Sequence, residues 1–404
     1  MRHAHHRFYL SAFFLDFAVS CGFTAIPFFV FHELGGGARM SGTIGAVQSL
    51  FYGMTCLLTA GVVMRTRGGL RWAVAGSLGY GIALPLATLF REPVAFTVMT
   101  VIACMLMALY WPAMQAWVGS EPNPAVRAKR IGVFNIWWSA GLAGAPLIAG
   151  PLYEVDYHWP FVLVFFTSIV AMALTMTLPR ADAHHASIEG NVDQAKHDAA
   201  SEAHLWCGWC ANFMGWAMVG VMRSVFPKRV DELVNSGELV VGFGTFAWER
   251  LDWGAATQYS WLMTFMYVVR AASSFGLGSW QGWHHRFSVL VWSQIMAAVA
   301  FCVLGVTKSL SVMVLCAITV GVSGAVTFFA SLFYSVANSE KRHRRAAIHE
   351  ATVGLGSFSG AMLFGELAGR FGTTWPFLYT PIFISAGIAL QYFLLKAGSR
   401  RTTL

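Results

Sequence analysis

The sequence predicts an all-α polytopic membrane protein with twelve transmembrane helices in two pseudo-symmetric six-helix bundles. Three observations lead to this fold class: an apolar composition, recurring apolar segments of bilayer-crossing length, and a passage that occurs twice. Hydrophobic residues make up 56% of the 404 residues and charged residues only 11%, whereas soluble domains have about 25% charged residues. There are too few polar residues to cover a water-facing surface. We therefore expect most of the surface to face lipid.

Apolar segments of about 20 residues, the length that crosses a bilayer as a helix, follow one another along the whole chain. Charge clusters and turn residues separate them, and the longest polar stretch is ADAHHASIEGNVDQAKHDAASEAH. The predicted helices lie near residues 8–31, 41–63, 72–90, 94–117, 131–153, 159–178, 204–226, 256–280, 287–306, 310–335, 346–368 and 375–395.

These segments divide the chain into two bundles joined by a linker. Residues 1–178 form the predicted N-terminal six-helix bundle, and residues 204–404 form the C-terminal one, with an extended loop at 228–255. The polar segment 179–203 contains few large apolar residues, which is typical of a flexible linker.

The distribution of basic residues predicts the orientation. Well over half of the 27 lysines and arginines fall on the side that holds the termini and the linker, and basic loops stay in the cytoplasm. We therefore expect cytoplasmic termini and an integral protein of the bacterial inner (plasma) membrane. The net charge of +8 follows from these loops, so no nucleic-acid partner is expected.

The repeated passage indicates an internal duplication. SAGLAGAPLIAGPLYEVDYHWPF, at residues 139–161, resembles LGSFSGAMLFGELAGRFGTTWPF at 355–377. The aligned pairs include Gly144 with Gly360 and, in the first and seventh helices, Phe13 with Phe213. Their common order along the chain predicts two homologous halves with the same orientation, an architecture found in transporters.

Twelve helices in two sixes, with a cytoplasmic linker and cytoplasmic termini, resemble the major facilitator superfamily over essentially the whole chain. Gly141, Gly144, Gly150 and Pro151 are similar to the glycine- and proline-rich signature in the fifth helix of its antiporter-type members. Small residues at these positions let helices approach closely.

The loop between the second and third helices matches the family pattern only in part. Gly61, Arg67 and Gly68 resemble it, but Arg65 stands where the family has an aspartate. The resemblance implies gating roles for Gly61, Arg67 and Gly68, and we extend that expectation to residues of the fifth and eleventh helices. These further gating candidates are Gly144, Pro151 and Glu350.

Charged residues at membrane depth are candidate functional groups, because one charge at a helix centre costs about 2.5–3.5 kcal/mol on insertion scales. Asp16 lies near the middle of the first helix and aligns with Trp216 in the second half. It is expected to be a protonation or substrate site, or else a structural hydrogen-bonding group. Arg270 is expected either to contact an anionic substrate or to pair with Asp16 or Glu350. Arg223 lies near a helix end, where its side chain could snorkel.

Polar side chains beside large aromatic rings form a second group of candidates. Such a lining stacks an organic solute and orients it by hydrogen bonds, although tryptophans also belong to interfacial belts. The candidate substrate-binding residues are Asp16, Tyr110, Gln115, Asn135, Trp138, Trp216 and Arg270.

Secondary active transport of a small organic solute by alternating access fits these features, with the proton as candidate coupling ion. We expect no enzyme activity, no cofactor and no metal site, because no nucleotide-phosphate loop, ligand cluster or catalytic constellation is present in the sequence. The expected partners are the substrate and the lipid bilayer, and the protein is expected to be a monomer. The alternative is a non-transporting membrane sensor or assembly factor on a transporter scaffold.

Overall fold

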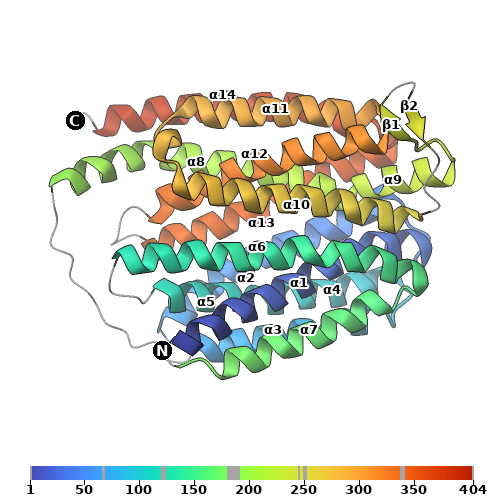
Figure 1. The fold of residues 1–404 in the computed structure, drawn as a ribbon, viewed down its shortest axis with the longest axis horizontal. Coiled ribbons are helices and arrows are strands. Elements are labelled where there is room, and N and C mark those ends of the chain that lie inside the picture. The colour runs from blue at the N-terminus through green and yellow to red at the C-terminus, as the bar shows by residue number, and fades with distance from the viewer. Residues whose placement is uncertain are drawn as a thin grey trace.

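The computed structural model describes residues 2–65, 69–119, 124–179, 192–243, 246–248, 253–336 and 342–402. The helices run side by side along the long axis of the molecule, and both chain ends lie at one end of it (Figure 1). We call that end the terminal end. The opposite end, which carries a small two-stranded hairpin, is called the distal end.

Within the described ranges, the first half has seven helical segments. They are α1 (Arg2–His32), α2 (Ala38–Arg65), α3 (Gly69–Ala87), α4 (Pro93–Ala108), α5 (Tyr110–Gly119), α6 (Pro124–Val155) and α7 (Trp159–Met176).

In the described part of the second half there are seven α-helices, one 3-10 turn and the hairpin. They are α8 (Val192–Ser224), α9 (Phe226–Asn235), β1 (Val241–Phe243), β2 (Phe246–Trp248), α10 (Ala255–Ser279), η1 (Gln281–Trp283), α11 (Phe287–Val306), α12 (Leu310–Val336), α13 (Arg342–Phe371) and α14 (Trp375–Thr402). The strands pair antiparallel, with Gly242 opposite Ala247.

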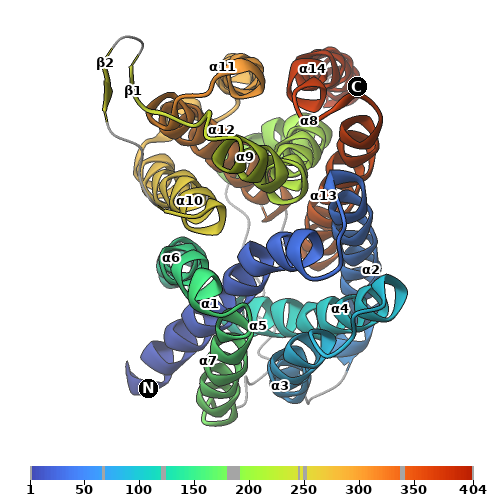
Figure 2. The same ribbon diagram turned by 90° about the vertical axis from the view of Figure 1, so that its right-hand side faces the viewer.

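The predicted fold class is confirmed. α4 and α5 together make one span, and so do α8 and α9. The helices therefore make twelve spans in two groups, α1–α7 and α8–α14 (Figure 2). Eight of the described segments are long and apolar enough to cross a membrane. Three spans outside those eight, α2, α10 and α13, pack against the other half of the molecule. There, part of each helix faces protein instead of lipid.

The fourth span is broken at Leu109, three residues before Pro112. A proline ring clashes with the carbonyl four residues earlier and offers it no N–H. The carbonyl in question belongs to Ala108, and it accepts a weak hydrogen bond from the Cys56 thiol of α2 at 3.9 Å. A neighbouring helix thus compensates for the break, as is usual inside membranes.

Two predicted boundaries differ from the structure. α8 begins at Val192, inside the segment predicted as linker, and α9 continues the seventh span to Asn235, inside the predicted loop 228–255. α9 is helical because it has an apolar face to bury, which includes Phe226 and Val230. Arg229 fastens it by donating hydrogen bonds to the Leu304 carbonyl at 2.8 Å and the Thr307 carbonyl at 3.2 Å. The domain boundaries proper stay a prediction.

The repeated passage performs the same packing role in both halves. A Cβ at Gly141 of α6 would collide with the Phe13 carbonyl of α1, and one at Gly360 of α13 would collide with the Ala217 carbonyl of α8. Glycine is therefore required where these helices touch backbone to backbone. The neighbouring Gly356 meets the Phe213 carbonyl, and Phe213 is the sequence partner of Phe13.

Candidate functional site

Asp16 lies halfway along α1 and is 6% exposed. Its Oδ2 atom has no hydrogen-bond partner in the described part of the chain, and none of the ion pairs found there includes it. The structural hydrogen bond considered as its alternative role is therefore not observed. Asp16 does interact electrostatically with Arg223 and Arg270 of the second half and with Glu350.

Arg270 lies in the middle of α10 and is 4% exposed. We expected an acidic partner because burying an unpaired charge is costly. That expectation is wrong: among the described residues, no carboxylate lies within ion-pairing distance of Arg270, and its Nη1 and Nη2 atoms have no hydrogen-bond partner. Its guanidinium carbon lies instead 4.8 Å from the Trp216 ring centre and 5.1 Å from that of Phe328. Aromatic faces attract a cation in this geometry.

Trp138 completes this aromatic surrounding from the other half, 5.9 Å from the Arg270 guanidinium and 5.8 Å from the Phe328 ring. Asn135 orients it by accepting a hydrogen bond from the Trp138 indole at 3.0 Å. Rings from α6, α8 and α12 therefore surround one arginine between the two halves.

Arg223 does not snorkel to the membrane surface. Its Nε donates to the Tyr267 hydroxyl at 3.1 Å, and its guanidinium carbon lies 4.5 Å from the Phe23 ring centre and 5.6 Å from that of Trp216. Sequence reasoning did not include it among the substrate-binding candidates because it lies late in its helix. The break before α9 and the inward direction of its side chain place it between the halves.

His349 of α13 is a further buried group that the sequence did not single out. Its Nδ1 shares a hydrogen bond with the Ser331 hydroxyl at 2.8 Å, and its ring packs 4.9 Å from that of Phe328. Its Nε2 atom and the Trp216 Nε1 atom have no hydrogen-bond partner within the described ranges. The second half therefore places several polar atoms around Arg270 that are available to a ligand.

Other predicted binding residues have different positions. Tyr110 is fully buried within the first half, and its hydroxyl shares a hydrogen bond with Ser11 at 2.8 Å. Its hydroxyl is thus already engaged in packing α5 against α1. Gln115 belongs to α5, but its side chain lies outside the described residues.

The predicted gating residues are dispersed. Gly61 is part of α2, whereas Arg67 and Gly68 lie outside the described residues. Gly144 and Pro151 lie on α6, where a Cβ at Gly144 would meet the Phe17 ring at 3.7 Å. Glu350 accepts a hydrogen bond from the Tyr52 hydroxyl of α2 at 3.1 Å, so it links the two halves.

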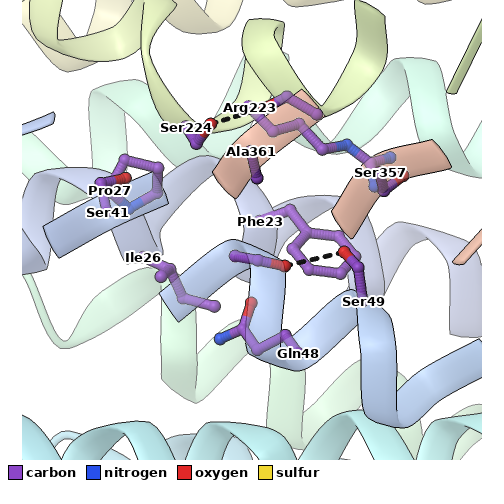
Figure 3. Close-up of a pocket in the computed structure, with 12 residues that line it drawn as sticks. Phe23, Ile26, Pro27, Ser41, Gln48, Ser49, Arg223, Ser224, Ser357 and Ala361 are labelled. Carbon is purple, nitrogen blue, oxygen red and sulfur yellow. Dashed lines mark hydrogen bonds between the residues drawn. The ribbon is translucent and has the colours of Figure 1, made fainter. Parts of the chain in front are cut away.

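A pocket lies between the halves on the distal side of Asp16, bounded by α1, α2, α8 and α13. In Figure 3 the Arg223 side chain extends from α8 toward Ser357 of α13, with the Phe23 ring below it. The Gln48 amide also lines this pocket, and its Nε2 atom has no described partner. Phe23 separates the arginine from the amide in this view, so they do not converge on one point.

The distal end joins the halves by polar contacts. Arg39 of α2 pairs with Glu366 of α13 at 2.7 Å, and His32 of α1 lies 3.3 Å from Asp231 of α9. Glu154, the penultimate residue of α6, accepts hydrogen bonds from backbone amides at the start of α10. These donors are Gly254, at 3.2 Å, and Thr257, at 2.8 Å. The two halves are thus held together on this side of the central charges.

Comparison with known families identifies the fold. A model of the Major Facilitator Superfamily matches residues 8–248, more than half of the chain. The chain belongs to the Major Facilitator Superfamily. No curated protein sequence matches it.

Solved superfamily structures share the architecture. A bacterial homologue of the human lysosomal transporter Spinster, in an inward-facing and unoccupied conformation, has a TM-score of 0.74 at 13% identity, with 99% of this chain and 98% of that chain covered. The nucleoside transporter NupG has a TM-score of 0.75 at 12% identity, with 97% and 99% covered. Such low identities concern the fold alone. The family and the apolar helices indicate an integral membrane transporter.

Proposed function

We propose that this superfamily member is a secondary active transporter that moves a small organic solute by alternating access of the two halves. The observation that carries the proposal is a group of charges midway along the molecule, of which Asp16 and Arg270 are buried and Arg223 is partly buried. Asp16 of the first half interacts electrostatically with Arg223 and Arg270 of the second half. None of the three has an ion-pair partner in the described structure. Charges at membrane depth mark substrate and ion pathways.

The contacts at the distal end support a rocking movement. Both described ion pairs between the halves, Arg39–Glu366 and His32–Asp231, lie there. Opening this end would break these pairs and the Glu154 hydrogen bonds, which are short-range and partly exposed. The Arg39–Glu366 pair is exposed, and exposed pairs contribute little because water screens them, whereas Asp231 of the other contact is buried.

We assign the distal end to the outside of the cell and the terminal end to the cytoplasm, from the distribution of basic residues. We also propose that the protein lies in the bacterial inner membrane and acts as a monomer. Protease added to one side of oriented vesicles tests on which side of the membrane the 179–203 linker lies.

Asp16 is the proposed carrier of a coupling proton. It is the one acidic residue of α1 within the span, and it lies where both halves meet. A carboxylate that alternately binds and releases a proton can couple a pH gradient to the movement of the halves.

Counterflow in proteoliposomes tests the proposal. Vesicles preloaded with a solute are given a radioactive trace of the same solute, over a panel of sugars, amino acids, organic acids and organic cations. Saturable exchange of at least one solute is expected. Binding without exchange across the panel would instead support a sensor.

The coupling role has a separate test. Asp16→Asn is expected to abolish accumulation of an exchanged solute under an imposed pH gradient. The matched control is Asp156→Asn, an exposed aspartate of the distal loop whose side chain accepts hydrogen bonds from the neighbouring His158. Accumulation by Asp16→Asn at the wild-type level would remove the assignment.

A further inference from the structure

The central site contains one buried acid and one buried base that do not satisfy each other. Asp16 and Arg270 are each more than nine-tenths buried, and they interact electrostatically. Yet they form no ion pair within the described structure, and Asp16 Oδ2 and both Arg270 Nη atoms have no hydrogen-bond partner. An unpaired charge in such surroundings is costly, so each is suited to a complementary ligand group.

Asp16 and Arg270 carry opposite charges when both are ionised, so together they are neutral. With Asp16 ionised, an anionic ligand at Arg270 would leave Asp16 unsatisfied and give the two groups a net negative charge, and a cationic ligand at Asp16 would leave Arg270 unsatisfied. A ligand that carries both charges satisfies both residues and preserves neutrality.

The surroundings of Arg270 specify the rest of such a ligand. Trp138, Trp216 and Phe328 present aromatic rings beside the guanidinium, and Trp216 Nε1 and His349 Nε2 are polar atoms without described partners. The rings can pack against an apolar body while the arginine and these nitrogens hold an acid group.

We infer that the site binds a zwitterion, an amino-carboxylic acid whose ammonium group contacts Asp16 and whose carboxylate contacts Arg270. This inference rests on the proposed transport function and names its substrate class. An ammonium group and a coupling proton would then occupy the same carboxylate in turn, which is the behaviour of an exchanger.

The test uses matched ligands on the purified full-length protein. Isothermal titration measures the affinities of two zwitterions. In phenylalanine the ammonium and carboxylate groups are adjacent, and in 6-aminohexanoate they are widely separated. Each is compared with its N-acetyl form, which keeps only the acid, and its methyl ester, which keeps only the amine. For at least one scaffold, the zwitterion should bind at least about tenfold more tightly than both blocked forms, the effect of one charged hydrogen bond.

Two variants locate the two contacts. Asp16→Asn should remove the advantage of the zwitterion over its N-acetyl form, and Arg270→Gln should remove its advantage over the ester. Asp156→Asn, in the distal loop, should retain both advantages. Arg270→Lys, which keeps the charge, should retain most of the advantage over the ester and guards against a merely misfolded Arg270→Gln.

Each outcome decides something. Affinity for a blocked form equal to that for its zwitterion on both scaffolds overturns the inference, and so does binding of none of the six compounds. If zwitterions bind selectively but do not exchange in counterflow, the transport proposal fails while the ligand class stands. If a singly charged solute exchanges and zwitterions do not, transport stands and the ligand class fails.

Discussion

The two halves of the molecule use the same packing but different central chemistry. Gly141 in the first half and Gly360 in the second each admit a neighbouring helix backbone. At the centre, in contrast, Asp16 of the first half aligns with Trp216 of the second, whose ring lies against Arg270. Duplication therefore maintains the scaffold, and divergence of a few side chains creates an acidic side facing a basic and aromatic side.

The largest expected effect comes from breaking the shared packing. Gly141→Leu and Gly360→Leu should each destabilise the protein by about 1–3 kcal/mol or more, because overpacking forces the backbones apart. Thermal unfolding in detergent measures the change. Gly132→Leu on the same helix as Gly141 is the control, since nothing lies within 4 Å of a Cβ there. Unchanged thermal stability in either variant would contradict the backbone contact at that glycine.

A second prediction concerns the unequal central rings. The Trp216 ring lies near the guanidinium groups of both Arg270 and Arg223. Of these two arginines, Trp138 lies near Arg270, at 5.9 Å compared with 4.8 Å for Trp216. Trp216→Ala should weaken the apparent affinity for an exchanged solute by about tenfold and Trp138→Ala by about threefold, because a desolvated cation–π contact contributes more than a looser one. Concentration dependence of counterflow measures both. An equal effect of the two changes would argue against an aromatic site centred in the second half.

A third prediction concerns the junction between the halves at the distal end. Glu154→Gln removes a negative charge from the start of α10, where the helix dipole favours it by about 0.3–1 kcal/mol. Hydrogen–deuterium exchange should therefore become faster at residues 254–260. The matched control is Asp156→Asn, which removes a nearby acid whose hydrogen bonds stay within its own loop. Unchanged exchange in Glu154→Gln would show that this contact does not hold the halves together.

The smallest expected effect comes from an ion pair inside one half. Lys308 hydrogen-bonds Glu238 at 2.8 Å and holds the pKa of that exposed carboxyl below its usual value. A lowered pKa gives a stabilising contribution that is present at neutral pH and is lost as the pH falls through the folded-state pKa. Glu238→Gln should leave the melting temperature at pH 7 nearly unchanged, because exposed pairs contribute little. A clear loss of stability at pH 7 would contradict the prediction that this exposed ion pair contributes little.

Much of the fold could be predicted because bilayer crossing and duplication leave strong marks on a sequence. The twelve spans followed from apolar length. The aligned glycines Gly144 and Gly360 do not make equivalent contacts, because a Cβ at Gly144 would meet only the Phe17 ring, whereas one at Gly360 would collide with the Ala217 carbonyl. The breaks at Leu109 and Val225 were not predicted, since a proline inside a membrane span can either kink a helix, end it or be accommodated. Pro27 lies within the continuous α1, whereas Pro227 lies in the first turn of α9.

The candidate site was predictable in kind but not in arrangement. Asp16, Trp216 and Arg270 were evident as polar or aromatic groups at depth, yet Arg270 was expected to have an acidic partner and is instead surrounded by rings. Tyr110 looked equally suitable and is engaged by Ser11 inside the first half. Arg223 and His349 were passed over because helix position alone does not give the direction of a side chain.

The sequence by itself determined the membrane location, the helical spans and the relation of the two halves, because these depend on composition, length and order along the chain. Only the tertiary structure decided which charges meet between the halves and which remain unpaired. The pairing of these charges depends on how each helix is rotated about its axis and on contacts between residues hundreds of positions apart. A helix that is apolar on nearly all sides can face lipid with any of them, so its sequence does not fix this rotation.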